Sequence, residues 1–342
     1  MATGYVYDPI YLKHETGAHP ERPERLEAIM NALRGEGLLD ILVTVHPRAA
    51  TVEEILYVHS QRHVDHVRQV AASGGGYLDP DTVLSSRSYD AALMAAGGTI
   101  NAVDAVLEGR ATDVMALVRP PGHHATVDSG MGFCLFNNVA IAARHAQKAR
   151  GIGRIMIIDF DVHHGNGTQD AFYGDDTVLY LSTHQYPHYP GTGHYDETGS
   201  GKGKGYTVNI PMPAGVGDQG YKRAFDEIVA PVARRFTPEF IMVSAGYDAH
   251  WADPLAMMQL STSGYGDLVR IIKALADDLC QGRIVVALEG GYDLRALATS
   301  VVATISVLAG REFSDILGPA RNARHEPNLD SLFAAIKKVH GL

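Results

Sequence analysis

The chain has 342 residues, of which 46% are hydrophobic and 20% are charged, a composition typical of a soluble globular protein. Its formal net charge of −10, without a visible basic patch, argues against nucleic acid as a direct partner. Its two cysteines exclude a disulfide framework. No apolar run is long enough to span a bilayer, and no signal peptide is visible at the start. These features predict a cytoplasmic protein.

Short apolar runs rich in β-branched residues alternate with longer amphipathic segments. We expect buried strands at 41–46, 114–118, 154–160, 178–182, 206–211, 239–245 and 283–289. We expect helices at 23–36, 60–72, 86–108, 136–149, 218–236, 262–281, 293–310 and 328–340. This alternation predicts an α/β fold with a mostly parallel multi-stranded sheet and helices on both faces. The Gly-rich stretches 73–76 and 191–205 are expected to be loops, and the absence of a linker predicts a single domain.

Polar side chains follow four of the predicted strands at the point where each strand ends. In an open α/β sheet, ligands bind outside the carboxyl ends of the strands. One such segment, RPPGHHA, places the adjacent His123 and His124 behind a Pro-Pro-Gly turn. A second, DFDVHHGNG, contains Asp161 and His163, which an extended backbone would point to the same side. Such a pair can supply two ligands to one divalent metal ion.

Two further strand ends complete the set. SAGYDAHWADP supplies Asp248 and Asp253, and LEGGYDL supplies Tyr292 behind a glycine turn. Each feature alone has an ordinary explanation, such as a loop histidine, an aspartate that caps a helix or a packed tyrosine. Together they offer two carboxylates and an imidazole for a metal with an open position, the pattern of a catalytic site. The remaining imidazoles and the phenol suit hydrolysis, as a general base, an electrostatic partner and an oxyanion donor.

These segments resemble the histone deacetylase family, which has the arginase–deacetylase fold. The matching pieces lie in the family's order: HPERPERL, RPPGHHA, GFCLFNN, DFDVHHGNGTQDAF, YPGTG, SAGYDAH and LEGGYDL. Asn166 resembles the class II branch, because class I members usually have Asp there. The resemblance implies a single deacetylase catalytic domain over 1–342. It also implies removal of an acetyl or similar acyl group from an amine such as a lysine side chain.

The resemblance implies a zinc ion as cofactor, with ferrous iron as an alternative in the cell. The implied ligands are Asp161, His163 and Asp248. His124 would act as general base and then as general acid. His123 would be the neighbouring, mainly electrostatic histidine.

Three further residues complete the implied catalytic set. Asp159 would orient His123 and Asn166 would orient His124, since such partners set the tautomer and basicity of a histidine. Tyr292 would donate its hydroxyl to the oxyanion that forms from the substrate carbonyl.

The resemblance also implies a narrow substrate tunnel and two structural potassium sites. The implied tunnel residues are Gly132, Phe133, Tyr189, Leu255 and Gly291. A rim aspartate, Asp79 or Asp81, would bind the substrate backbone, and Arg22 would lie behind the site near an acetate exit. The first potassium set comprises Asp159, Asp161, His163, Ser182 and Thr183. The second potassium set comprises Phe172, Asp175, Val178 and Tyr206.

The substrate class is the most open part of this interpretation. Tyr189 stands where the family usually has Phe, and Leu255 stands where polyamine-specific relatives have Glu. Residues 73–98 also lack the insertion that shields the channel of acetylpolyamine hydrolases. These features favour an acyl-lysine peptide and leave an acetylpolyamine as the alternative. Two remoter alternatives are a non-catalytic acyl-lysine binder and a dimanganese ureohydrolase, which would need Asp where Gly165 stands.

Overall fold

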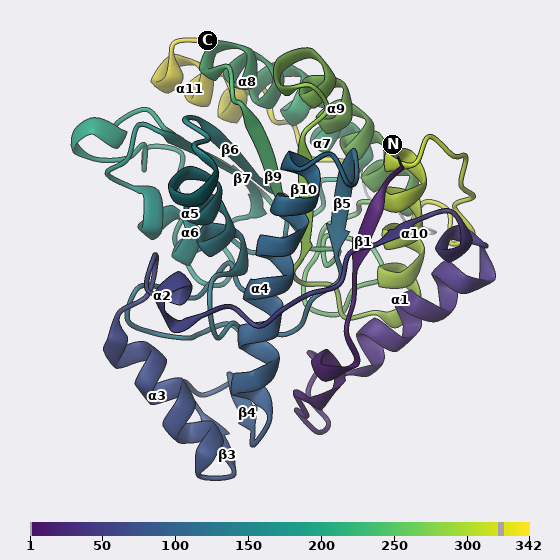
Figure 1. Ribbon diagram of the computed structural model, residues 1–342. Helices are drawn as coiled ribbons and strands as arrows, with labels where there is room; N and C mark the ends of the chain where they lie inside the picture. Colours follow the sequence, from purple (N-terminus) through teal and green to yellow (C-terminus); the bar gives the residue numbers. More distant parts are fainter. Residues whose placement is uncertain (1, 321–324) are drawn as a thin grey trace.

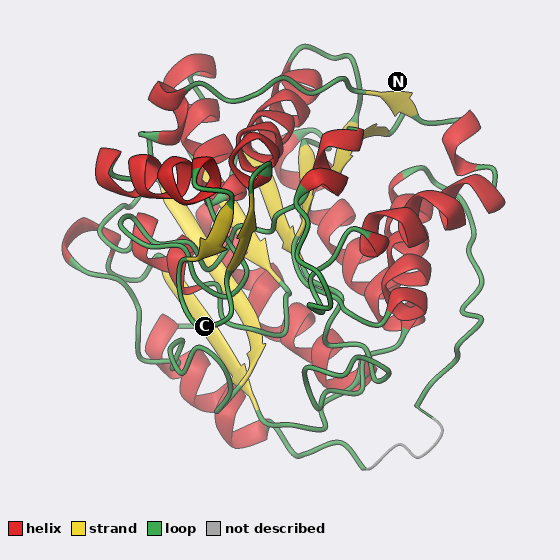
Figure 2. Ribbon diagram, turned by 90° about the horizontal axis from the view of Figure 1, so that it is seen from below, coloured by secondary structure: helices red, strands yellow, loops and turns green. Residues whose placement is uncertain are grey.

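The computed structural model describes residues 2–320 and 325–342. Within them, the centre of the molecule is an eight-stranded parallel sheet in the order β2-β1-β5-β10-β9-β6-β7-β8 (Figures 1 and 2). The strands of this sheet are β1 Gly4–Val6, β2 Val43–Thr44, β5 Asp113–Ala116, β6 Ile155–Asp159, β7 Val178–Gln185, β8 Thr207–Met212, β9 Phe240–Ala245 and β10 Ile284–Leu288. A separate antiparallel pair consists of β3 Gly75–Tyr77 and β4 Val83–Ser85.

Helices surround this sheet. They are α1 Glu24–Gly35, α2 Val52–Ile55, α3 Gln61–Ala72, α4 Ser88–Leu107, α5 Asn138–Arg150, α6 Asn166–Phe172, α7 Asp218–Ala224, α8 Ala230–Phe236, α9 Thr262–Cys280, α10 Leu294–Leu308 and α11 Asp330–His340. Short 3₁₀ turns span Pro9–Lys13, Leu38–Asp40 and Gly201–Gly203, and a π-helical turn at Phe225–Val229 joins α7 to α8. Among the described helices, none has both the length and the apolar character needed to cross a bilayer.

The helices form two packed layers. In one layer, α4 crosses β1, β5 and β10 and packs beside α5 (Figure 1). In the other, α1, α10 and α9 pack on one another in that order, and α7 and α8 continue the layer against α9. Every residue of β6 to β10 is buried, which is what a sheet covered on both faces requires. The predicted α/β architecture with helices on both faces is therefore confirmed.

The predicted strands and helices all exist, and the differences concern short elements. Five short elements were not predicted, because three to seven residues are too few to show a hydrophobic period; they are β1, β3, β4, α2 and α6. The segment 41–46 contributes only the two residues of β2, since Ile41 ends a 3₁₀ turn. The prediction of a loop over 73–76 was wrong at Gly75 and Gly76, which pair with β4.

The order of the strands brings the four polar segments together. β5, β10, β9 and β6 are neighbours, and their carboxyl ends lie in register. Ala287 of β10 pairs with Ala116 of β5 and with Ser244 of β9, and Ser244 pairs with Asp159 of β6. The loops that follow these four strands therefore emerge side by side at one edge of the sheet.

Candidate active site

The first cluster at this edge, called here the metal group, consists of Asp161, His163 and Asp248. Asp161 and His163 follow β6, and Asp248 follows the adjacent β9. His163 Nδ1 lies 3.1 Å from Asp161 Oδ1 and 3.1 Å from Asp248 Oδ2. All three side chains are buried, and one potential ligand atom from each lies within 4.8 Å of the others. The structure thus gathers the three predicted metal ligands at one point.

The metal group has the properties that a divalent cation requires. Asp248 Oδ2 is buried and makes no well-aligned hydrogen bond among the described residues, since the His163 imidazole 3.1 Å away is shared with Asp161, and a buried oxygen of this kind favours a nearby cation. A Cβ atom added at Gly246 or Gly290 would overlap the aspartate oxygens, so these glycines keep the space around the oxygens open. Against the effect of burial, the two aspartates raise the pKa of His163 to about 10, so their negative charge favours a cation at this point. Oxygen and nitrogen donors of this kind suit zinc or ferrous iron.

Two histidines lie beside the metal group on the loop after β5. His123 Nδ1 lies 3.1 Å from Asp159 Oδ2, and His124 Nδ1 lies 2.8 Å from Asn166 Oδ1. Burial, reinforced by the neighbouring imidazoles, lowers the pKa of His124 well below its usual value. Burial also opposes the charge of His123, but the adjacent carboxylates raise its pKa to about 10. Because the Asn166 oxygen accepts from Nδ1–H, a neutral His124 presents Nε2 as a free proton acceptor.

Tyr292 lies on the loop after β10 and is held from two sides. Its backbone N–H donates to Asp253 Oδ2 at 2.6 Å. The guanidinium carbon of Arg25 lies 5.0 Å from the centre of the Tyr292 ring. Arg25 in turn donates to the carbonyl oxygens of Glu289 and Gly291, each at 2.6 Å. Burial raises the pKa of Tyr292 well above its usual value, so its hydroxyl remains protonated and available as a donor.

A cavity of about 220 Å³ leads to these groups. It is lined by Asp81, His124, Gly132, Phe133, His163, His188, Tyr189, Leu255 and Tyr292. Four of the five predicted tunnel residues are therefore on its wall. Gly291 is not a wall residue in this structure, because its carbonyl is directed to Arg25 behind Tyr292.

The cavity lining distinguishes Asp81 from Asp79 and adds a residue that was not predicted. Asp81 lines it, whereas Asp79 Oδ1 accepts hydrogen bonds from the backbone N–H groups of Asp81 and Thr82. His188 was missed, although it lines the cavity and its ring stacks on that of His163 with centroids 5.1 Å apart. A histidine in the segment QYPHYPGTG, close before Tyr189, was the available signal.

The structure also differs from the sequence prediction in the region behind Tyr292. We expected Arg22 there, but the residue that contacts Tyr292 is Arg25, which is fully buried while Arg22 is partly exposed. Arg25 Nη1 forms an ion pair with Glu21 Oε1 at 3.0 Å. Glu21 also forms an ion pair with the buried Arg119. The sequence HPERPERL offers two arginines three residues apart; Arg25 lies on the buried face of α1, whereas Arg22 precedes the helix.

The predicted potassium residues lie close to these strands but their role stays a prediction. Thr183 Oγ1 is buried and has no hydrogen-bond partner among the described residues, and Asp159 lies opposite Ser182 in the β6–β7 pairing. In the second set, the Asp175 carboxylate already binds Arg144 at 2.5 Å. The set also includes Phe172 at the end of α6, Val178 at the start of β7 and Tyr206 directly before β8.

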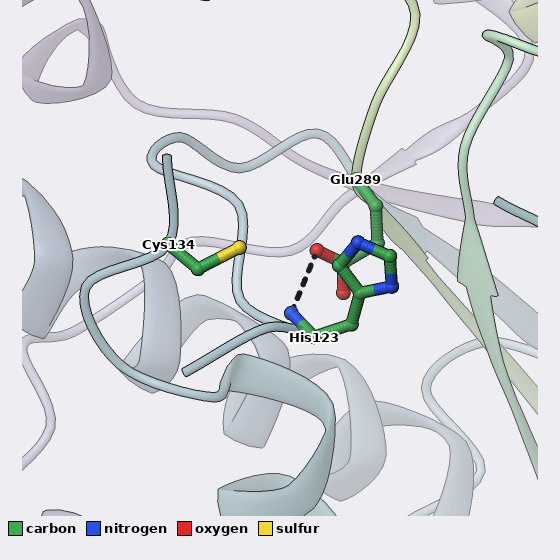
Figure 3. Close-up of side chains that lie close together, drawn as sticks. All are labelled: His123, Cys134 and Glu289. Carbon is green, nitrogen blue, oxygen red and sulfur yellow. Dashed lines mark hydrogen bonds between the residues drawn. The ribbon is translucent and has the colours of Figure 1, made fainter. Parts of the chain in front are cut away.

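A second buried cluster, called here the support group, consists of His123, Cys134 and Glu289 (Figure 3). Its ligand-type atoms also lie within 4.8 Å of one another. However, both carboxyl oxygens of Glu289 accept hydrogen bonds from protein groups, and Cys134 Sγ donates to the Gly132 carbonyl at 3.4 Å. Burial raises the pKa of the Cys134 thiol well above its usual value, so it remains neutral. The support group is therefore an internally hydrogen-bonded cluster and a poor metal site.

A parallel sheet with its reactive side chains at one carboxyl edge is the architecture of an α/β enzyme. Comparison with known proteins identifies the family more closely. Residues 19–308 match the histone deacetylase domain. The chain therefore belongs to the histone deacetylase family and is a hydrolytic deacetylase, in a family that is generally metal-dependent.

Individual relatives agree with this assignment. A "Probable deacetylase" from Archaeoglobus fulgidus is 46% identical over 323 residues, covering 93% of this chain and 89% of its own length. "Histone deacetylase 14, chloroplastic" from Arabidopsis thaliana is 45% identical, covering 88% of this chain and 75% of its own. The crystal structure of the HDA15 HD domain superposes with a TM-score of 0.87 at 42% identity, covering 92% of this chain and 91% of that one. The arginase–deacetylase fold expected from the sequence is thereby confirmed.

Proposed function

We propose that this deacetylase is zinc-dependent and that its substrate is an acetylated lysine side chain in a peptide. The observation that carries the proposal is the position of the metal group, whose His163 lies on the cavity wall together with His124 and Tyr292. A zinc ion held by Asp161, His163 and Asp248 would polarise the substrate carbonyl and make a bound water more acidic.

The side chains of the protein would supply the proton transfers. His124 Nε2 takes a proton from the attacking water, and the same nitrogen returns it to the leaving amine. His123, between Asp159 and the metal group, would place positive charge beside the reacting centre, because the adjacent carboxylates raise its pKa against the effect of burial. Tyr292 donates its hydroxyl to the carbonyl oxygen as negative charge develops there. The T-shaped contact of Phe133 with Tyr292, at 5.7 Å between ring centres, narrows the cavity around the substrate stem.

The wall of the cavity favours a lysine stem with a peptide outside it. Phe133 and Tyr189 present aromatic surface to a methylene chain, and Leu255 adds apolar contact at the rim. Asp81 is exposed at the rim, where its carboxylate can accept hydrogen bonds from the backbone of a bound peptide. The same groups bind any acyl-lysine peptide whose side chain reaches His163.

An acetylated polyamine is the second candidate substrate. Asp81 places one carboxylate at the rim, and the formal charge of −10 attracts polycations in general. Against it, Leu255 offers no charge-assisted hydrogen bond to a distal ammonium. A dimanganese ureohydrolase is disfavoured, since a side chain at Gly165 would collide with Asp159 and Tyr180. The cytoplasmic location and the potassium ions stay predictions.

The decisive experiment is a kinetic comparison of an acetyl-lysine peptide, a longer acyl-lysine peptide and acetylspermidine, measured before and after chelation. We expect the highest kcat/KM with the acetyl-lysine peptide, loss of activity on chelation, and recovery when zinc is added. A simple alkyl hydroxamate should inhibit, because it binds zinc and contacts His124 and Tyr292. Full activity in the chelated enzyme, or no effect of a hydroxamate at high concentration, would refute the zinc assignment.

A further inference from the structure

Glu289 is a buried carboxyl group that the proposed chemistry does not use. It directly follows β10, three residues before Tyr292, and none of its surface is exposed. Its Oε2 accepts hydrogen bonds from the backbone N–H groups of Gly122 at 2.6 Å and His123 at 3.2 Å. Its Oε1 accepts a hydrogen bond from Ser244 Oγ at 3.1 Å. One side chain therefore joins the carboxyl ends of β5, β9 and β10.

The main chain of Glu289 is connected to the tyrosine as well. Its carbonyl oxygen accepts from Arg25 Nη2, and the Arg25 guanidinium lies against the Tyr292 ring. Figure 3 shows the Glu289 carboxyl directed toward the backbone N–H of His123. Glu289 thus contacts both of the loops that carry the proposed proton donors and acceptors, one through its side chain and one through its main chain.

We propose that Glu289 is a positioning residue for the deacetylation reaction, which holds the loop of His123 and His124 in its working place relative to Tyr292. The inference rests on the proposed roles of His124 and Tyr292. Two backbone N–H groups bound to one oxygen fix the path of the loop, and a displacement of about 1 Å at a catalytic group can cost about 10²-fold in rate. No other acceptor for the Gly122 N–H is seen among the described residues.

The protonation state of Glu289 does not alter this role. Burial raises its pKa to about 7, against the opposing effects of His123 and the backbone N–H of Gly122. In either state Oε2 can accept from the two amides, while Oε1 can accept from or donate to the hydroxyl of Ser244. A glutamine amide has the same shape, with its oxygen as the acceptor and its NH₂ as the donor to Ser244. Glu289→Gln should therefore restore the geometry that Glu289→Ala removes.

The experiment compares these two variants with Asp104→Asn as a matched control. Asp104 is also a buried carboxylate, 2.8 Å from both His145 Nε2 and Arg150 Nε between α4 and α5. On an acetyl-lysine peptide, Glu289→Ala should lower kcat about 10²-fold, with KM and bound metal nearly unchanged. Glu289→Gln should keep kcat within about fivefold of wild type. Asp104→Asn should lower Tm and leave kcat unchanged.

Two outcomes would overturn the proposal. One is a folded, metal-loaded Glu289→Ala enzyme with wild-type kcat. The other is a Glu289→Gln enzyme as impaired as Glu289→Ala, which would assign the effect to charge. If Glu289→Ala does not fold, Glu289→Asp takes its place, because the shorter side chain cannot span to the loop, and wild-type kcat there is equally contradictory.

A double-mutant cycle separates positioning from general stability. In a His124→Ala background, Glu289→Ala should cause no further loss of kcat, because there is no longer a base to position. An additive loss would contradict the inference. Failure of the proposed function is distinguishable, since the wild-type enzyme would then not turn over the acetyl-lysine peptide at all.

Discussion

The metal group and the support group are two buried triads at the same edge of the sheet, and they differ in how their polar atoms are satisfied. In the metal group, Asp248 Oδ2 makes no well-aligned hydrogen bond among the described residues and faces the His163 imidazole at 3.1 Å. In the support group, the oxygens of Glu289 and the sulfur of Cys134 all have protein partners. Proximity of ligand-type side chains is therefore a weak criterion for a metal site. A buried carboxylate oxygen without a well-aligned hydrogen bond, beside a space that glycines keep open, is a stronger criterion.

The largest effect that tests this difference is expected from His163→Ala. The variant should lose bound metal and at least about 10³-fold in kcat/KM, since metal catalysis contributes several kcal/mol to the barrier. Metal content per chain and peptide deacetylation would be measured on the same preparation. A variant that retains both one metal ion and wild-type activity would show that the metal group is wrongly assigned.

Tyr292→Phe should separate the oxyanion donor from the metal group. We expect kcat to fall about 10²- to 10³-fold, because one hydrogen bond to the developing oxyanion is lost. Bound metal and Tm should remain close to wild type, since the backbone N–H of Tyr292 and its contact with Asp253 are retained. Steady-state kinetics with metal analysis provide the measurement. Wild-type turnover in Tyr292→Phe would remove the tyrosine from the mechanism.

Leu255→Glu tests how the rim of the cavity selects the substrate. A charge-assisted hydrogen bond to a distal ammonium contributes about 1.5–3 kcal/mol, which corresponds to about 10- to 100-fold. We therefore expect the ratio of kcat/KM for acetylspermidine to that for an acetyl-lysine peptide to rise by this factor. The ratio would be measured at low and at near-physiological salt, because long-range attraction is screened by salt. A wild-type ratio well above one in both salts would contradict the preference for acyl-lysine.

The smallest effect is expected for Cys134→Ala in the support group. The thiol is buried and neutral, so its loss should cost about 1 kcal/mol in the free energy of unfolding. Metal content should not change, and kcat should stay within about threefold of wild type. Denaturant unfolding and metal analysis would check this. Loss of a metal ion in Cys134→Ala would instead give the support group a ligand function.

The site residues that could be predicted from the sequence are those in the few residues after a strand. Asp161 and His163 could be predicted as a pair because two residues of extended backbone place them on one side. Asp248 could be added because parallel strands end at a common edge. Arg25 and His188 could not be assigned in this way. Their roles depend on the helical phase of α1 and on the path of the loop before Tyr189, which are set by packing.

The sequence by itself determined the α/β class, the positions of the long strands and helices, and the four polar segments, because hydrophobic period and strand-end placement are local properties. Only the tertiary structure decided that β5, β10, β9 and β6 are neighbours with their ends in register. It also decided that Asp81 rather than Asp79 reaches the cavity, and that Glu289 binds the loop of His123. These contacts join segments far apart in the chain, and the packing of the whole sheet and its helices sets the distances between them.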